Sequence, residues 1–147
     1  MPEKVAFAAG RLMLGRIQEL ILAKEDFAFE TTLSTKSYVS LIRFAREQGY
    51  RIILLFIWLK NPELAIERVS VRVKKGGHFI PDDVVRRRYQ RGLKNLFELY
   101  LPDVDSAYIV DNSIQEPQII AQGKWQFDWQ IFNSDIWNQI SSYGNDH

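Results

Sequence analysis

The chain has 147 residues, of which 46% are hydrophobic and 25% charged, which is the make-up of one soluble globular domain. It contains no cysteine, and this excludes disulfides and thiolate metal sites. The longest apolar run, Ile52–Leu59, is far shorter than the roughly 20 residues that a membrane-spanning helix needs. No secretory signal is recognisable, so the sequence predicts a cytoplasmic protein without a membrane segment.

Charge is unevenly distributed, although the net charge is only +1. The segment from Arg68 to Lys94 carries nine basic residues against Asp82 and Asp83, a local excess of +7. Such a block favours an anionic partner, and phosphate is the simplest candidate. Nucleic acid is a weak alternative, because no known nucleic-acid-reading module accompanies the block.

The N-terminal residues predict a helix followed by a short strand. Apolar residues recur at helical spacing and indicate an amphipathic helix over roughly residues 4–24. Residues Asp26–Thr31 then alternate, with Phe27 and Phe29 on one side, which is typical of a strand.

A second helix precedes an apolar strand. Ser34 or Thr35 can cap this helix, and Gly49 ends it. Its apolar face consists of Tyr38, Leu41, Ile42 and Ala45. The run Arg51–Leu59 that follows is typical of a fully buried strand in a parallel sheet.

The middle of the chain predicts two helices and a further strand. Asn61 and Pro62 form a strong helix start, and this helix ends at Gly76–Gly77. A second helix opens at residues 80–83, and Ala107–Val110 reads as a strand. Strands separated by helices of this length favour an α/β fold, a three-layer parallel sheet with flanking helices.

The C-terminal tail is rich in aromatic residues. Four residues alternate with polar ones and predict a strand: Trp125, Phe127, Trp129 and Ile131. This strand can form a hairpin with Gln118–Ala121, turning at Gln122–Gly123. The tryptophans of the tail, Trp125, Trp129 and Trp137, lie among acids and amides, which favours core or interface packing over nucleobase stacking.

Three stretches, in their order and spacing, resemble the zeta-toxin-like P-loop kinases. They are FAFETTLS (27–34), LKNPELAIERV (59–69) and RVKKGGHFIP (72–81), the last running on to RRRY (86–89). DNS (111–113) fits as well, so the resemblance covers roughly residues 5–113. It implies a P-loop kinase fold that transfers a phosphoryl group from ATP with Mg²⁺, and it suggests a small hydroxyl-bearing substrate such as a UDP-amino sugar.

The resemblance also implies roles for individual residues. Glu30 and Thr32 match the substrate-binding pair of the family, and Arg72, Arg87 and Arg88 match its catalytic arginines. Phosphoryl transfer needs such cations, because it depends on positioning and charge stabilisation. Each residue also has a purely structural alternative. Glu30 can be a solvated carboxylate at a strand end, and Thr32 can help to cap the following helix. The arginines can form a solvated helix face.

Helical geometry limits how many arginines can share one ligand. Each residue turns by about 100°, so Arg86, Arg87 and Arg88 cannot all point to the same site. Arg68 and Arg91 are the near alternatives that the resemblance implies for these roles.

The phosphate-binding loop of such kinases is not found in these residues. No stretch matches G-x-x-x-x-G-K-[ST] after a strand. The nearest string, GRLMLGRI (10–17), has Arg16 in the lysine position and Ile17 in the position of the Mg²⁺-binding hydroxyl, and it lies in a helical pattern. We therefore expect a P-loop kinase type lacking its N-terminal strands and phosphate loop, and no activity from this chain alone.

Asp111 and His78 are the remaining candidates. Asp111 can contact the nucleotide or cap the turn that it forms with Asn112 and Ser113. His78 has no partner at metal-ligand spacing and His147 is terminal, so no metal site is predicted.

Two hypotheses from different classes follow. The first is an ATP-dependent kinase; the second is a non-catalytic remnant that binds a partner, either an antitoxin-like protein or a missing half of the kinase. In both, the chain forms a single domain with a kinase-like core and lid over residues 1–113 and a hairpin and helix extension over residues 114–147.

Overall fold

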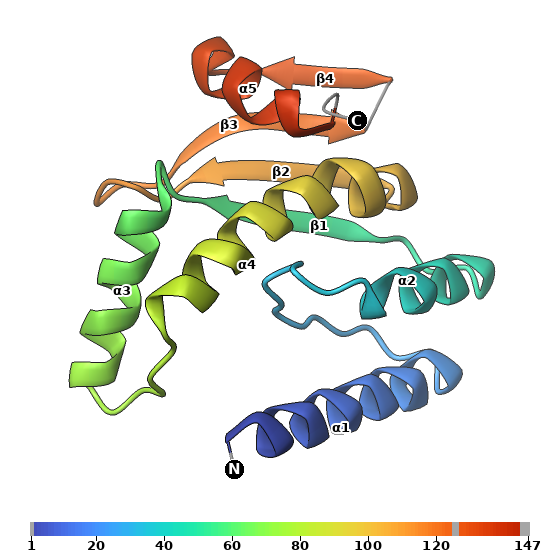
Figure 1. Ribbon diagram of the computed structural model, residues 1–147. Coiled ribbons are helices and arrows are strands. Elements are labelled where there is room, and N and C mark those ends of the chain that lie inside the picture. Colours follow the sequence, from blue (N-terminus) through green and yellow to red (C-terminus); the bar gives the residue numbers. More distant parts are fainter. Residues whose placement is uncertain (1, 125–126, 145–147) are drawn as a thin grey trace.

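The structure is a computed structural model that describes residues 2–124 and 127–144. Five α-helices occur in the described residues (Figure 1): α1 (Pro2–Leu22), α2 (Ser37–Glu47), α3 (Pro62–Lys74), α4 (Asp82–Asn95) and α5 (Ser134–Ser141). Four strands form the sheet: β1 (Ile53–Trp58), β2 (Ser106–Asp111), β3 (Gln118–Lys124) and β4 (Asp128–Ile131). Of the helices in these residues, none is both long and apolar enough to cross a membrane. Trp125 and His147 lie outside the described residues.

The sheet is mixed, with the strand order β1-β2-β3-β4. β1 and β2 are parallel, while β2–β3 and β3–β4 are antiparallel. The prediction of a parallel sheet is therefore correct for one pair only. Helices α3 and α4 connect β1 to β2 and allow a parallel crossover, whereas the short link over residues 112–117 permits only an antiparallel neighbour.

The predicted C-terminal hairpin is confirmed, but its turn lies later than expected. Gln122 pairs with Gln130 and Gly123 pairs with Trp129, so both residues lie within the ladder. The chain reverses between Lys124 and Asp128 instead. The aromatic tail packs inward: the rings of Trp129 and Trp137 are 4.8 Å apart, and Trp137 meets Phe97 at 5.8 Å between centroids.

The two faces of the sheet differ. Helices α4 and α5 cover one face (Figure 1), and Ile109, Ile120 and Ala121 are buried beneath them. The opposite face of β1 carries Ile53 and Leu55, whose exposed fractions are 59% and 61%. The prediction that β1 is fully buried is wrong, and the described residues form no third layer, because none of them covers this face.

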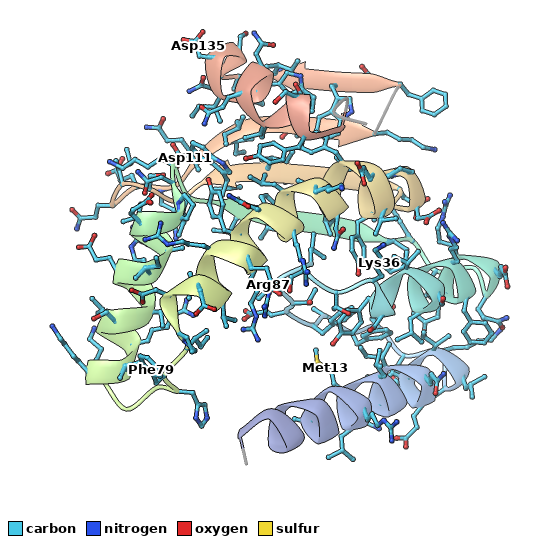
Figure 2. All side chains as sticks on the ribbon, in the orientation of Figure 1. Met13, Lys36, Phe79, Arg87, Asp111 and Asp135 are labelled. Carbon is cyan, nitrogen blue, oxygen red and sulfur yellow. The ribbon has the colours of Figure 1, made fainter. Side chains whose placement is uncertain are left out.

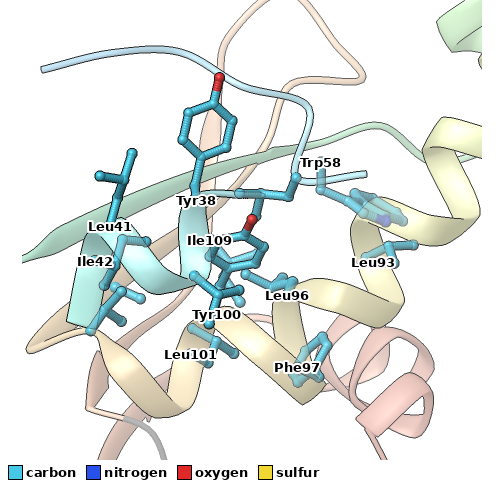
Figure 3. Close-up of a cluster of buried hydrophobic side chains, with 14 of the residues drawn as sticks. Tyr38, Leu41, Ile42, Trp58, Leu93, Leu96, Phe97, Tyr100, Leu101 and Ile109 are labelled. Carbon is cyan, nitrogen blue, oxygen red and sulfur yellow. The ribbon is translucent and has the colours of Figure 1, made fainter. Parts of the chain in front are cut away.

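The hydrophobic core lies between the covered face of the sheet and the helices. Figure 3 shows its centre, to which α2 contributes Tyr38, Leu41 and Ile42. The end of α4 and the π-helical turn that continues it, Leu96–Tyr100, contribute Leu93, Leu96, Phe97 and Tyr100. The predicted apolar face of α2 is thus confirmed. The Tyr100 hydroxyl donates a hydrogen bond to the Thr35 carbonyl at 2.6 Å, which ties the start of α2 to this core.

The helix starts follow the sequence signals to different degrees. Asn61 caps α3 as predicted, since its Oδ1 accepts a hydrogen bond from the Leu64 N–H at 2.8 Å. The residue that precedes α2 is Lys36, which lies one residue after Thr35 and two after Ser34, so neither predicted residue occupies the cap position. Thr35 Oγ1 instead accepts from the Ser37 N–H at 3.1 Å, in a turn that leads into the helix. Gly49 and Gly76 end their helices with positive φ angles of 90° and 95°.

The segment over residues 26–31 forms no strand, which corrects the prediction. Phe27 and Phe29 nevertheless both pack against aromatic residues, as their alternation with polar residues predicted. Phe27 packs on Tyr50 at 5.9 Å between ring centroids, and Phe29 packs on Tyr38 at 5.0 Å. In the described part of the chain, the backbone of these residues makes no hydrogen bond to the backbone of another segment. The residues are extended, but they lack the neighbour that would make them a strand.

The turn after this segment is held by α4. Asn95, which is 7% exposed, donates from Nδ2 to the Leu33 carbonyl at 2.7 Å. Leu33 itself is buried with φ 60°, a left-handed conformation that costs free energy in a residue with a side chain. At Gly92 a Cβ atom would lie 2.8 Å from the Thr32 carbonyl oxygen, so the helix comes this close because glycine has no side chain.

We expect Gly92→Ala to lower the free energy of unfolding by about 1–3 kcal/mol, because α4 or the turn must move away. Gly15→Ala in α1 is the matched control, since nothing lies within 4 Å of its Cβ position. There alanine should stabilise the helix by about 0.5–1 kcal/mol. Urea unfolding measures the free energy of unfolding of both variants. If Gly92→Ala stabilised the protein as much as Gly15→Ala, the close approach at Gly92 would be contradicted.

Candidate anion-binding site

A surface depression of about 540 Å³ lies at the carboxyl end of β1. Its lining comes from the turn before α2, the end of β1, α3 and the residue after β2: Thr32, Ile57, Leu59, Arg68, Val71, Arg72 and Asn112. These segments meet because parallel strands end at the same edge of a sheet, and open α/β sheets bind their ligands at that edge. A further depression, of about 360 Å³ between α1 and α2, has no charged side chain in its lining.

Arg68 and Arg72 lie four residues apart on α3 and so share one face of the helix. Arg68 Nη2 donates to the carbonyls of Asn112 at 3.0 Å and Ser113 at 3.4 Å, which fixes α3 to the segment after β2. Arg72 is exposed and forms no ion pair with any described residue. Its guanidinium is therefore available to an anion in the depression.

Hydroxyl groups lie on the turn that lines the other side of the depression. Thr32 Oγ1 and Ser34 Oγ are 2.7 Å apart, in a hydrogen bond that either group can donate. The Ser34 N–H also donates to Thr32 Oγ1 at 3.4 Å. Thr32 thus presents a hydroxyl opposite two guanidinium groups, a combination that suits an oxygen-rich anion.

Two carboxylates on the elements that form the depression, Asp111 and Glu63, are engaged elsewhere. Asp111 Oδ1 accepts from the Ser113 N–H at 2.9 Å, so the capping alternative for Asp111 is observed. Its contact with a nucleotide stays a prediction. Glu63 Oε1 accepts from Arg86 Nη1 at 2.9 Å, an ion pair that joins α3 to α4.

The structure brings together only part of the predicted site. Thr32 and Arg72 line the depression, whereas Glu30, Arg87 and Arg88 are exposed and do not. Figure 2 shows Arg87 extending from α4 toward the side where the segment preceding α2 lies. The three successive arginines do diverge as helical geometry requires, since Arg86 turns to α3.

Tyr89 anchors α4 to the end of β1 and was not among the candidate site residues. Its hydroxyl donates to the carbonyl of Leu59, a residue that lines the depression, at 2.6 Å. Burial raises the pKa of Tyr89 to about 12. The neutral hydroxyl is therefore the form that the folded protein favours.

Asn112 and the α4 residues behind Thr32 were also missed as parts of the site. From the sequence, Asn112 is predicted only to belong to a turn. Its carbonyl accepts from Arg68 because of how α3 packs, and local sequence does not predict that packing. Gly92 carried a usable signal, since a glycine inside a helical pattern often marks a close backbone approach. The sequence gives no indication of which segment makes that approach.

The Tyr89 contact predicts a pH dependence of stability. The unfolded-state pKa is near 10 and the folded-state value about 12. The stabilisation from the neutral hydroxyl is complete below pH 10 and disappears as the pH rises through 12, so stability should fall in this window. Tyr89→Phe should flatten this fall, and it should cost about 1 kcal/mol at neutral pH for the lost hydrogen bond.

Urea unfolding at a series of pH values measures the effect. Tyr108→Phe, on the exposed face of β2, is the matched control and should leave the slope intact. A Tyr89→Phe variant with the same slope as the original protein would disprove the assignment.

The fold and the site define an α/β protein whose cationic depression lies at the carboxyl end of a parallel strand pair. Residues 3–115 match the model of the zeta toxin family, and the chain belongs to that family. A protein of Haemophilus influenzae that carries only the description "Uncharacterized protein" is 35% identical over 88 residues, which cover 60% of this chain and 63% of that protein. No solved structure matches the chain.

Proposed function

We propose that the chain supplies the substrate-binding and charge-stabilising part of an ATP-dependent kinase. The reaction is transfer of the γ-phosphoryl group of ATP to a hydroxyl of a small substrate, with a UDP-amino sugar as the candidate class. The observation that carries the proposal is the unpaired Arg72 beside Arg68 and Thr32 in the depression. Membership of the zeta toxin family supports the same reaction class.

The chemistry of the depression suits phosphate. Arginine presents several N–H donors in one plane and can bind two phosphate oxygens at once. In phosphoryl transfer, negative charge spreads over the transferred group, so preorganised cations lower the barrier. Arg72 is the residue that we assign to this role, and Arg68 positions α3 while adding its charge.

The other predicted residues take more distant roles in the proposal. Thr32 binds the substrate hydroxyl region directly, and Glu30 lies two residues earlier on the same extended segment. Arg87 and Arg88 contribute only when α4 and bound substrate come closer, as in the closing of a kinase lid.

The donors present fit the phosphates of ATP but do not provide the whole site. The 147 residues contain no G-x-x-x-x-G-K-[ST], the loop whose backbone amides hold the phosphates of a nucleotide. In the described residues no three carboxylate or imidazole side chains cluster as metal ligands, so we assign Mg²⁺ no ligand from this chain. We propose that the chain by itself binds its phosphate-bearing substrate without turning over ATP.

Binding of UDP-N-acetylglucosamine, measured by isothermal titration calorimetry, tests the proposal. Arg72→Ala should weaken binding about tenfold or more, because a charge-assisted hydrogen bond contributes about 1.5–3 kcal/mol. Arg16→Ala removes the same charge from an exposed ion pair on α1 and should leave the affinity unchanged.

Three outcomes contradict parts of the proposal. If the Arg72→Ala variant bound UDP-N-acetylglucosamine as tightly as the original protein, the assignment of the site would be wrong. If N-acetylglucosamine, which has no phosphate, bound as tightly as UDP-N-acetylglucosamine, the site would not recognise the diphosphate. Release of phosphate from ATP by the chain alone would disprove the lack of turnover.

A second function, binding of a protein partner without catalysis, is favoured by a separate observation. β1 is at the end of the strand order, and Ile53, Leu55 and Ile57 on one of its faces are exposed. Exposed apolar strands of this kind are typical of surfaces that a partner covers.

A further inference from the structure

β4 forms the edge of the sheet at the opposite end from β1. It pairs with β3 on one side, and no described residue pairs with its other side (Figure 1). The match to the zeta toxin family ends at residue 115, so both strands of this hairpin lie beyond it. The β4 edge is therefore a surface that the family match does not account for.

The backbone of β4 directs one of its donors away from the sheet. The Phe132 N–H donates to the Ile120 carbonyl at 2.8 Å, which places this N–H on the β3 side. Successive residues of a strand point their N–H and C=O groups to opposite sides, so those of Ile131 point away from β3. A further strand can add at this edge without breaking a hydrogen bond of the hairpin.

Two polar side chains of β4 share one face of the strand. Gln122 Nε2 donates to Gln130 Oε1 at 3.2 Å, and among the described residues no group accepts from the Gln130 amide nitrogen. Asp128 lies two residues earlier, is exposed and forms no ion pair with a described residue. The edge thus carries an amide donor and a carboxylate acceptor that have no described partner.

We propose that two copies of the chain pair through β4 in antiparallel orientation and join their sheets into one. A twofold axis perpendicular to the sheet passes between the two copies of residue 129. Gln130 then lies opposite Asp128 of the second copy, and Ile131 lies opposite Phe127 of the second copy. This inference does not depend on the kinase reaction proposed above.

In this register the donors and acceptors of the two copies are complementary. The Gln130 amide nitrogen donates to the Asp128 carboxylate of the second copy, because opposed residues lie on the same face. The Ile131 N–H donates to the Phe127 carbonyl of the second copy. Symmetry repeats each contact, so every interaction occurs twice. A charged residue usually prevents pairing at an edge strand, whereas here each carboxylate meets an amide donor.

Neighbouring registers lack this complementarity. A slip of two residues in one direction places the Asp128 carboxylates of the two copies opposite each other, and like charges in this position are destabilising. The same slip in the other direction places Asp128 opposite the Phe132 ring, where it has no donor. A slip of one residue puts opposed side chains on different faces of the sheet. The side chains of β4 therefore specify one register for self-pairing.

The dimer leaves the anion site accessible. β1 is the strand farthest from β4 in the sheet order, so the β1 strands lie at the two outer ends of the joined sheet. The depression beside Leu59 and Arg72 lies at the end of β1 and away from the twofold axis. Each copy keeps its own depression open to solvent.

Sedimentation equilibrium of the full chain tests the proposal through a pair of charge variants. The original chain should be a dimer at about 0.1 mM and should dissociate on dilution. Gln130→Glu places two carboxylates opposite each other at both ends of the pair, and should weaken dimerisation by about tenfold. Gln130→Lys places opposite charges there and should strengthen dimerisation by a similar factor.

Matched controls separate this effect from a change in net charge. Gln90 is exposed on α4, so Gln90→Glu and Gln90→Lys should both leave dimerisation unchanged. Ile131→Pro removes the outward N–H and should abolish the dimer, whereas Ile131→Ala retains this N–H and should keep it. Circular dichroism of each variant checks that the secondary structure persists.

Three results would overturn the proposal. One is a chain that stays monomeric at about 0.1 mM. Another is a dimer on which Gln130→Glu and Gln130→Lys act equally. The third is a dimer that Leu55→Lys dissociates and Gln130→Glu does not, because the contact would then lie on the uncovered face of β1, where Leu55 is 61% exposed.

Discussion

The parallel pairing of β1 with β2 is the constraint on which the site depends. Its register runs without interruption from Ile53 opposite Ser106 to Trp58 opposite Asp111, so both strands end at one level. Leu59 and Asn112 follow at this level, and both line the depression. The capping of α3 by Asn61 then starts a helix directly at the strand end. The register of this strand pair thus sets where α3 begins and where its arginines lie.

The α4 helix acts on the same edge from the other side. Tyr89 holds the end of β1, and Gly92 and Asn95 hold the turn that carries Thr32. Each contact involves a backbone carbonyl, so α4 holds the main chain at this edge. The left-handed conformation of Leu33 costs free energy, and the contacts of α4 with this turn offset that cost.

Local signals in the sequence were sufficient for most helices. The spacing of Tyr38, Leu41, Ile42 and Ala45 predicted the buried face of α2, and Asn61 with Pro62 predicted the start of α3. The family could be recognised from short motifs in their order. These successes share one cause, because each depends on residues within a few positions of one another.

Features that depend on distant partners could not be predicted in the same way. The residues 26–31 have the alternation of a strand, but a strand exists only when a neighbour supplies hydrogen bonds. The rotation of α4 decided that Arg86 meets Glu63 and that Arg87 and Arg88 lie outside the depression. For β1 the apolar composition predicted burial on both faces, and the described residues supply cover for only one.

Two local inconsistencies remain after folding, and they lie side by side. One is the apolar β1 strand with an open edge and an exposed face; the other is an extended, unpaired segment along that edge. Natural sequences are usually consistent between local pattern and final environment, and exceptions concentrate at functional surfaces. Arg72, at the end of the same edge, is exposed and forms no ion pair with a described residue, so apolar and cationic groups without partners adjoin along this edge.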